Sequence, residues 1–332
     1  MPKIVVLGLG SIGERHLRNL RALGEEDIAV VRVLNRAPRD PALLEGVTVY
    51  RSLEQALGDG VEAAVICTPA SMHTQAALEA AEAGCHLFIE KPVSDRLDDL
   101  DRLCRLVAAR ELVSLVGFNL RFHPALCQLA RWIESGAVGR VLSVRAEAGQ
   151  YLPDWHPWED YRIGYSARRA LGGGVILDLI HEIDYAAWLF GSASAVFCMG
   201  GRHSSLEIDT EDVVEILLRC ERAPVVEIHL DYLQRRYRRT CQVIGEEGTL
   251  FWNDAEGRAW IERAGASTDE ERRFSLDRNE MFVAEMRHFL QCIARREMSR
   301  VPLEDGVRSL RIALAARRSL ETRRIEHLEA DG

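Results

Sequence analysis

The stretch KIVVLGLGSIGERHLRNLRALG (3–24) decides the fold of the first part of the chain. It indicates an apolar strand, a glycine turn and an amphipathic helix, and Gly8, Gly10 and Gly13 form the pattern G-x-G-x-x-G within it. In this context the first glycine permits the turn, the second admits a pyrophosphate close to the backbone, and the third lets the helix pack on the strand. The start of the helix offers free N–H groups and a positive dipole end to a phosphate. The stretch therefore predicts a dinucleotide-binding strand–turn–helix unit.

Strand and helix patterns alternate through the next hundred residues. Apolar strands are expected at 28–34, 62–68, 86–90 and 112–118, and helices at 72–84 and 98–111. Alternation of this kind predicts an α/β domain over residues 1–120, with a doubly wound parallel sheet and right-handed crossovers. Ligands of such sheets bind at the carboxyl ends of the strands. The expected cofactor-binding residues are Gly8, Leu9, Gly10, Ser11, Ile12, Gly13, Asn35, Arg36, Thr68, Pro69, His73, Glu90 and Asn119.

The end of the second strand selects the dinucleotide. NAD enzymes usually place Asp or Glu there, on the ribose 2′-hydroxyl, whereas this sequence has VLNRAPR (33–39) and no acid before Asp40. Arginine suits a 2′-phosphate because it is permanently charged and grips it through two N–H groups. The segment therefore favours NADP over NAD. The alternative is that Arg36 and Arg39 are solvated loop residues and that Asn35 holds the ribose of NAD.

The stretch GGGVILDLIHEIDYAAWLFG (172–191) predicts one helix over 174–190 with an unusual second face. One side of the helix is an apolar stripe that belongs in a core. Asp178, His181 and Glu182 gather on the other side among further apolar residues, so that face is not an ordinary solvated one. We expect Glu182 to be solvated and Asp184 to pair locally with an arginine, and we assign neither to catalysis.

The rest of the chain, residues 121–332, indicates a second α+β domain. Several β-rich segments alternate apolar and polar residues, which predicts a large, mostly antiparallel sheet covered on one face by helices at 122–135, 174–190 and 279–297. The other face has no helical cover, so we expect subunits to pair sheet to sheet in a homodimer or homotetramer. RRYRR (235–239) indicates an exposed edge strand. The expected strand segments are 141–149, 195–201, 212–220, 224–234, 238–245, 249–254 and 258–263.

Composition excludes several classes of function. A formal net charge of −9 argues against nucleic acid as the main partner. No apolar run approaches the roughly 20 residues that cross a bilayer, and the first apolar run is too short for a signal peptide, so a cytoplasmic protein without a membrane partner is expected. His156 and Asp154 have no evident third ligand, so no metal site is expected.

Substrate contacts are expected from two segments. NLRFHP (119–124) supplies Arg121 at the junction of the domains, and the loop YLPDWHPWEDYR (151–162) supplies Trp155, which can stack on a sugar or cover a site. Arg162 and Arg168 would suit a carboxylate or a phosphate on the substrate. The alternative is a packed surface loop with solvated arginines.

The segment FIEKPVS (88–94), together with G-x-G-x-x-G and GGGVILDLIHEID, resembles the Gfo/Idh/MocA family of oxidoreductases. The segments 68–73, 117–124 and 304–319 are similar to further recurrent parts of that family. The resemblance implies an N-terminal Rossmann domain and a C-terminal domain built on a mostly antiparallel sheet. It also implies that the protein oxidises or reduces one carbon of a sugar, sugar acid, cyclitol or sugar nucleotide with NAD(P).

By position, Lys91 matches the family's catalytic lysine, His181 its acid/base histidine and Asp178 the aspartate that precedes this histidine. Many members space the last two by four residues, whereas the spacing here is three, so Asp178 departs from the family's pattern. Histidine suits removal of a hydroxyl proton because its ordinary pKa is about 6.5, and a lysine ammonium stabilises a developing alkoxide. Two rival readings stay open: a glycosidase or lyase that retains NAD and oxidises its substrate transiently, and a non-catalytic dinucleotide sensor.

Overall fold

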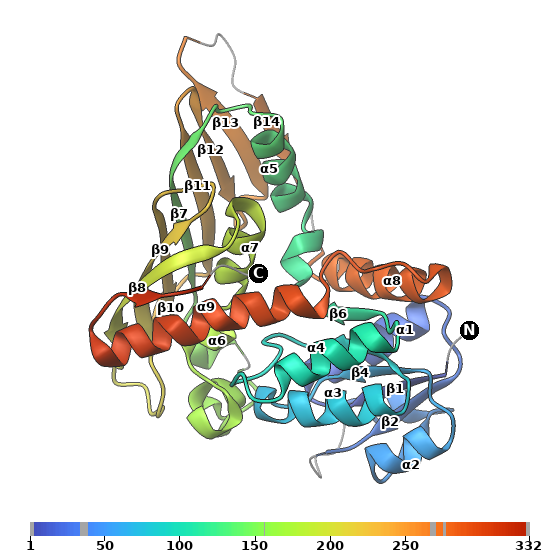
Figure 1. The fold of residues 1–332 in the computed structure, drawn as a ribbon. Coiled ribbons are helices and arrows are strands. Elements are labelled where there is room, and N and C mark those ends of the chain that lie inside the picture. The colour runs from blue at the N-terminus through green and yellow to red at the C-terminus, as the bar shows by residue number, and fades with distance from the viewer. Residues whose placement is uncertain (1–2, 34–38, 156, 266–269, 275–276, 330–332) are drawn as a thin grey trace. The chain divides into compact units, whose positions relative to one another are not determined.

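The computed structural model describes residues 3–33, 39–155, 157–265, 270–274 and 277–329 (Figure 1). The chain divides into two compact units, one formed by Met1–Asn119 with Arg278–Val307 and the other by Leu120–Asp277 with Arg308–Gly332. The boundary expected after residue 120 lies one residue from the first division. The segment Arg278–Val307 differs from expectation, because we placed it in the second domain and it packs within the first unit.

The first unit is built on a parallel sheet of six strands in the order β3-β2-β1-β4-β5-β6. The strand order reverses direction beside β1, which is the doubly wound arrangement that the alternating pattern predicts. All the carboxyl ends of these strands meet at one edge of the sheet, because the strands are parallel. The strands are β1 Ile4–Leu7, β2 Ile28–Val31, β3 Thr48–Tyr50, β4 Ala63–Ile66, β5 His86–Ile89 and β6 Ser114–Val116.

Helices cover both faces of this sheet. On one face α1 packs against α8, and on the other α2, α3 and α4 lie side by side. Phe88 of β5 points to the first of these faces, where its ring meets those of His16 on α1 and Phe289 on α8 edge to face. These contacts explain why the late segment joins the first unit. The helices are α1 Ser11–Ala22, α2 Leu53–Gly58, α3 His73–Glu82, α4 Leu100–Ala109 and α8 Glu280–Arg295.

The segment after α8 runs along the last strand of this sheet. The N–H of Val116 donates to the carbonyl of Val301, and the Ser299 hydroxyl donates to the carbonyl of Ser114. The segment after α8 therefore supplies hydrogen-bond partners to the outer side of β6, the edge strand of the sheet. For this reason α8 and the segment that follows it are integral to the first unit.

The second unit is built on a sheet of nine strands in the order β14-β13-β12-β11-β7-β10-β9-β8-β15. Its pairs are antiparallel except for β7 with β10, so the expected mostly antiparallel sheet is confirmed. The strands are β7 Val141–Gly149, β8 Ala193–Gly201, β9 Val213–Cys220, β10 Val226–Asp231, β11 Arg238–Gly245, β12 Gly248–Asn253, β13 Arg258–Arg263, β14 Glu270–Arg273 and β15 Glu326–His327.

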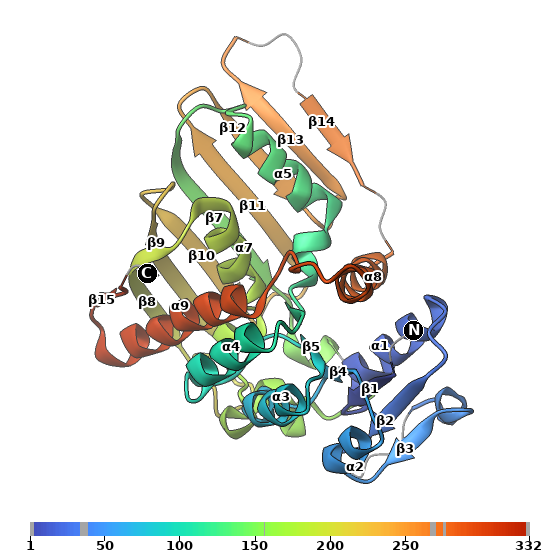
Figure 2. The ribbon, with the colours of Figure 1, turned by 45° about the vertical axis from the view of Figure 1, so that its right-hand side comes forward.

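Two helices of this unit lie on one face of the sheet (Figure 2). Helix α5 (Pro124–Glu134) contacts β12 and β13, and α7 (His181–Phe190) contacts β7 and β10. Side chains that alternate along the strands, such as those of Val144, Ala146 and Ala148 on β7, are buried beneath them. Helix α9 (Leu303–Thr322) begins in the first unit and continues in the second, where the Ser319 hydroxyl accepts the N–H of Cys198 on β8.

The expectation of an edge strand at 235–239 is wrong. Only Arg238 and Arg239 of this segment belong to a strand, and that strand, β11, lies inside the sheet between β12 and β7. Two arginines of the segment have specific partners: the guanidinium of Arg235 lies 3.7 Å from the ring centroid of Tyr151, and Arg239 reaches a buried carboxylate on α7.

Candidate functional site

The glycine turn after β1 has the geometry of a dinucleotide cradle. Gly8 has φ +93°, and a Cβ there would lie 2.8 Å from the carbonyl oxygen of Cys67; a Cβ at Gly13 would lie 1.9 Å from that of Gly8. Both positions therefore exclude a side chain for reasons internal to the fold. Gly10 has no atom within 4 Å of an added Cβ, and it immediately precedes α1, whose first N–H groups have no side-chain cap. The open side of the turn thus presents the N–H groups at the start of α1 as hydrogen-bond donors, which suits a pyrophosphate.

Polar groups without partners lie at the same edge of the sheet. Thr68 follows β4 and Asn119 follows β6, and both residues are buried. Among the described residues, neither Thr68 Oγ1 nor Asn119 Oδ1 has a hydrogen-bond partner. Buried polar atoms usually find partners, so two unsatisfied ones at a ligand-binding edge suit the amide or hydroxyl groups of a bound dinucleotide. Asn35, the expected ribose ligand of NAD, and Arg36, one of the two arginines that favour NADP, lie outside the described residues.

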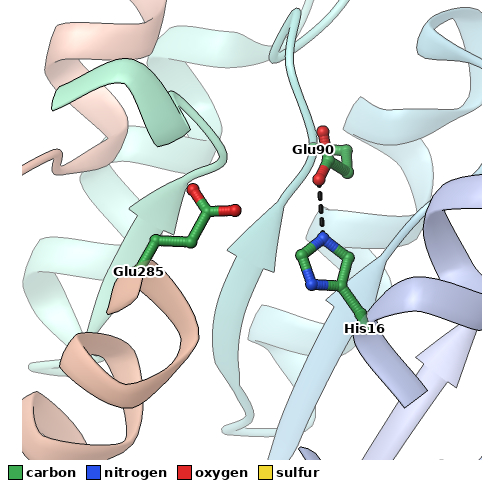
Figure 3. Close-up of side chains that lie close together, drawn as sticks. All are labelled: His16, Glu90 and Glu285. Carbon is green, nitrogen blue, oxygen red and sulfur yellow. Dashed lines mark hydrogen bonds and ion pairs between the residues drawn. The ribbon is translucent and has the colours of Figure 1, made fainter. Parts of the chain in front are cut away.

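The Glu90–Lys91–Pro92 turn after β5 is held from several directions. His16 Nε2 lies 2.7 Å from Glu90 Oε1 (Figure 3). The Lys91 N–H donates to Glu90 Oε2 at 3.1 Å. His73 lies between two carbonyl oxygens, with Nδ1 2.9 Å from that of Pro92 and Nε2 2.7 Å from that of Thr68. Burial lowers the pKa of His73. Lys91 itself is only half-buried. We assigned Glu90 and His73 to cofactor contacts, but their side chains hold the turn instead.

In the second unit the expected helix over 174–190 is broken. It forms a single turn, α6 (Val175–Asp178), and then α7, which begins at His181. Asp178 ends α6, and His181 is the first residue of α7, with 8% of its surface exposed. The two residues therefore lie on either side of a backbone break at Leu179 and Ile180, and the helical-wheel argument that placed them on one continuous face does not apply.

Asp178 accepts hydrogen bonds from three hydroxyl groups. They belong to Tyr165 at 3.2 Å, Ser166 at 2.5 Å and Tyr232 at 3.1 Å. A carboxylate accepts and does not donate, so this arrangement suits the ionised form of Asp178. Burial, reinforced by the Asp178 charge, holds the pKa of Tyr232 well above its usual range. Sequence reasoning missed Tyr165, Ser166 and Tyr232, because no motif marks a residue that follows a loop or ends a strand.

Glu182 and Asp184 serve as buried structural acids. The expectation that Glu182 is solvated is wrong: it is fully buried, and its Oε1 lies 2.8 Å from Nε of Arg239 on β11. Asp184 pairs with an arginine, but not with a local one: the partner is Arg121, 63 residues earlier in the sequence, whose Nε and Nη2 donate at 2.9 and 2.7 Å. Arg121 is therefore not the substrate ligand that we expected, because its two-pronged, buried contact with Asp184 occupies the guanidinium.

The remaining expected substrate residues divide into two groups. Trp155 meets Tyr232 edge to face at 5.4 Å between ring centroids, and so lies one contact away from Asp178. Arg162 pairs with Asp160 and Glu207, and Arg168 lies 4.0 Å from Asp209. The structure thus places Trp155 beside the Asp178 cluster and gives both arginines acidic partners on an exposed loop.

Within the described part of the chain, none of the helices has both the length and the apolar character that crossing a membrane requires.

Comparison with known proteins agrees with this architecture. Residues 2–118 match the oxidoreductase family with an NAD-binding Rossmann fold, and residues 127–251 match the GFO/IDH/MocA C-terminal domain. The myo-inositol 2-dehydrogenase of Thermotoga maritima is 27% identical over 98% of both chains. The scyllo-inositol 2-dehydrogenase (NAD(+)) of Bacillus subtilis is 27% identical over 96% of this chain and 93% of its own.

The fold is also found in solved structures. Levoglucosan dehydrogenase in complex with NADH and L-sorbose superposes with a TM-score of 0.86, at 20% identity and with 98% of each chain covered. The parallel six-stranded sheet with its glycine turn, the nine-stranded second sheet and the two matching family models lead to one conclusion. The chain belongs to the GFO/IDH/MocA family of NAD(P)-dependent oxidoreductases that act on CH–OH groups.

Proposed function

We propose that this enzyme transfers a hydride between NAD(P) and a CH–OH or carbonyl carbon of a neutral sugar or cyclitol, with Lys91 and His181 as its catalytic pair. The observation that carries the proposal is the Glu90–Lys91–Pro92 turn. Hydrogen bonds from both flanking sides fix its backbone at the edge of the sheet where the glycine turn lies, and the lysine remains half-exposed.

The composition of the chain supports a chemical role for Lys91. Of the 42 lysines and arginines in the sequence, only Lys3 and Lys91 are lysines. Positive charge elsewhere is therefore supplied by arginine, which keeps its proton under all ordinary conditions. An ammonium group can give and regain a proton beside a reacting oxygen, so a lysine at this turn fits a step in which charge develops on that oxygen.

The dinucleotide would be held by the glycine turn and by the edge residues. Leu9, Gly10, Ser11 and Ile12 surround the open start of α1, and Thr68 and Asn119 offer their unsatisfied buried oxygens. When bound, the cofactor supplies or accepts the hydride. We propose NADP as the preferred form, on the basis of Arg36 and Arg39 and the lack of an acid between residues 33 and 39.

In the second unit, His181 is proposed to take the hydroxyl proton during oxidation and to return it during reduction. Its ordinary pKa of about 6.5 suits exchange of a proton near neutral pH. Asp178 is proposed to organise the hydroxyls of Tyr165 and Tyr232, because it already accepts hydrogen bonds from both. These hydroxyls, together with Trp155, would give a polyol substrate a hydrogen-bonding and apolar surface.

The ion pairs of the loop arginines favour a neutral substrate over an acidic one. Arg162 and Arg168 have acidic partners, and Arg121 is buried against Asp184. A substrate carboxylate or phosphate would have to displace these partners. The names of the relatives, inositol and levoglucosan dehydrogenases, agree with a neutral polyol.

The test is an absorbance assay at 340 nm with NAD⁺ or NADP⁺ and a panel of myo-inositol, scyllo-inositol, glucose, glucuronate and UDP-glucose. We expect stoichiometric reduced cofactor with a neutral polyol, loss of turnover in Lys91→Met with dinucleotide binding retained, and normal turnover in the matched control Lys3→Met. Product formation without net reduced cofactor would instead identify a hydrolase or lyase. Turnover by Lys91→Met at the wild-type rate would contradict the proposed mechanism.

A further inference from the structure

Three buried ionisable side chains form a cluster behind the Glu90–Lys91–Pro92 turn (Figure 3). His16 comes from α1, Glu90 follows β5, and Glu285 comes from α8. One nitrogen or oxygen atom of each lies within 4.8 Å of the others. The exposed fractions are 0% for His16, 6% for Glu90 and 0% for Glu285. Burial this deep requires a defined distribution of protons, because an unpaired buried charge is costly.

The contact between His16 and Glu90 is a hydrogen bond and not a contact through a shared metal ion. His16 Nε2 and Glu90 Oε1 lie 2.7 Å apart, which is the length of a charge-assisted hydrogen bond. Two ligands of one tetrahedral zinc ion, with bonds of 2.0–2.1 Å, lie about 3.3 Å apart. The separation is therefore too short for a metal ion between these atoms. Glu90, which also accepts the N–H of Lys91, carries the negative charge of the pair.

Glu285 faces Glu90 without a hydrogen bond of its own. In the part of the chain that the structure describes, neither of its carboxyl oxygens has a hydrogen-bond partner. The other ionisable groups near it are His16, Arg15 on α1 and Cys67 after β4. Burial and then the charge of Glu90 raise the pKa of Glu285 well above its ordinary value, and Arg15 acts weakly in the opposite direction. Two carboxylates this close do not both ionise, so the proton resides on Glu285.

We propose that His16, Glu90 and Glu285 together position Lys91. In this cluster Glu285 is an uncharged acid, so a single negative charge, that of Glu90, lies behind the turn. This inference rests on the proposed role of Lys91. Glu90 is the link in the cluster, because one of its oxygens binds His16 and the other holds the Lys91 backbone. Its carboxyl group lies against Gly117, where an added Cβ would lie 3.1 Å from the Glu90 Cδ and Oε1 atoms, so a side chain at that position would press on the carboxyl.

The protonation of Glu285 is tested without any activity measurement. A carboxyl group whose pKa is raised by folding weakens the folded state as pH rises above its unfolded pKa of about 4.3, by about tenfold in the folding equilibrium constant per pH unit until the folded pKa is reached. Glu285→Gln lacks this penalty, so its melting temperature should exceed that of wild type by a margin that grows from pH 5 to pH 8. Glu280→Gln, at the exposed start of the same helix, is the matched control and should show a constant margin. A constant margin for Glu285→Gln as well would overturn the uncharged-acid assignment.

The positioning of Lys91 is tested by its NMR signal. Reductive methylation with ¹³C-formaldehyde labels two lysines, of which Lys3 is the internal reference, and the α-amino terminus. The Gln side chain has one oxygen acceptor, whereas the Lys91 N–H and His16 together need two. We therefore expect the Lys91 signal of Glu90→Gln to shift in position while the Lys3 signal stays fixed. An unchanged Lys91 signal would contradict the inference. So would stoichiometric zinc retained by wild type and lost in Glu285→Gln.

Kinetics separate this inference from the proposed function. With the substrate identified by the 340 nm assay, Glu90→Gln should lower kcat by about tenfold or more, the equivalent of one lost charge-assisted hydrogen bond, with little change in KM for the dinucleotide. A fall confined to KM would overturn the positioning role. If no polyol is oxidised, the proposed function fails, whereas the melting and NMR results still decide the state of the cluster.

Discussion

Gly10 and Gly13 belong to one turn but meet different surroundings, and that difference predicts different effects of the same substitution. A Cβ at Gly13 would collide with the Gly8 carbonyl at 1.9 Å, so Gly13→Ala should destabilise the first unit and lower the melting temperature. A Cβ at Gly10 would meet nothing within 4 Å, and its φ of −77° is open to alanine. Gly10→Ala should therefore melt like wild type and bind dinucleotide more weakly, as measured by NAD(P)H fluorescence. Unchanged affinity in a folded Gly10→Ala protein would remove this turn from the cofactor site.

His229 gives the second unit a specific pH dependence. Its Nε2 lies 2.8 Å from Asp231 and its Nδ1 2.6 Å from Glu215, and these contacts, Asp231 first, raise its pKa to about 9. Since the unfolded value is about 6.5, the stabilisation is fully present below pH 6.5 and is lost as pH rises to 9. His229→Gln should flatten the fall in stability over that window in urea unfolding series. Parallel curves for variant and wild type would show that His229 stays neutral.

At the scale of single residues, the sequence motifs identified residues that make specific contacts, but not the residues that they contact. The motif segments drew attention to Glu90, His73 and Arg121, but each of these side chains is used inside its own unit. His16 and Asp184, the partners of Glu90 and Arg121, lie 74 and 63 residues away in the sequence, whereas His73 contacts Thr68 within its own segment. A spacing within one segment carries no information on such long-range contacts, which is also why the hydroxyls around Asp178 went unnoticed.

At the scale of elements, the strands were the more predictable part. The segments 141–149, 238–245 and 258–263 match β7, β11 and β13 in both bounds, and within each strand buried residues recur at alternate positions, as Cys241 and Val243 do on β11. The place of β11 inside the sheet was not predictable, since it depends on pairing with β7 and β12. The break between α6 and α7 was hidden too, because apolar residues continue through it on every side.

The buried pair of Arg239 on β11 and Glu182 on α7 ties a helix to the middle of the sheet. Arg239→Met should destabilise the protein by about 3–5 kcal/mol, because Glu182 then keeps a buried charge without its guanidinium partner. The double variant Arg239→Met, Glu182→Leu should regain most of that loss. Urea unfolding of the two single variants and the double variant gives the coupling energy between the two side chains. If the losses in the free energy of unfolding simply add in the double variant, the two side chains are not coupled and the prediction is wrong.

At the scale of the whole molecule, the face of the large sheet away from α5 and α7 is the surface on which we expect subunits to pair. It carries the stacked rings of Phe251 and Trp260, whose centroids are 4.8 Å apart, and exposed ion pairs such as Arg145 with Glu227. Trp260→Glu should lower the molar mass measured by light scattering from that of a dimer or tetramer, with the fold retained by circular dichroism. Trp158→Glu, on the exposed loop, is the matched control and should keep the wild-type mass. A monomeric wild type would refute this prediction.

The late segment Arg278–Val307 means that the dinucleotide-binding unit is not encoded by one continuous stretch of gene. A fragment ending at residue 120 would lack α8, and so would expose the Phe88 ring and leave β6 without the segment that follows α8. An excised cofactor-binding module would therefore have to join residues 3–119 to 278–307 through a new linker. Recombination that exchanged only the first third of the gene would combine the six-stranded sheet of one protein with helix α8 of another. We therefore expect the segments for residues 3–119 and 278–307 to be inherited together.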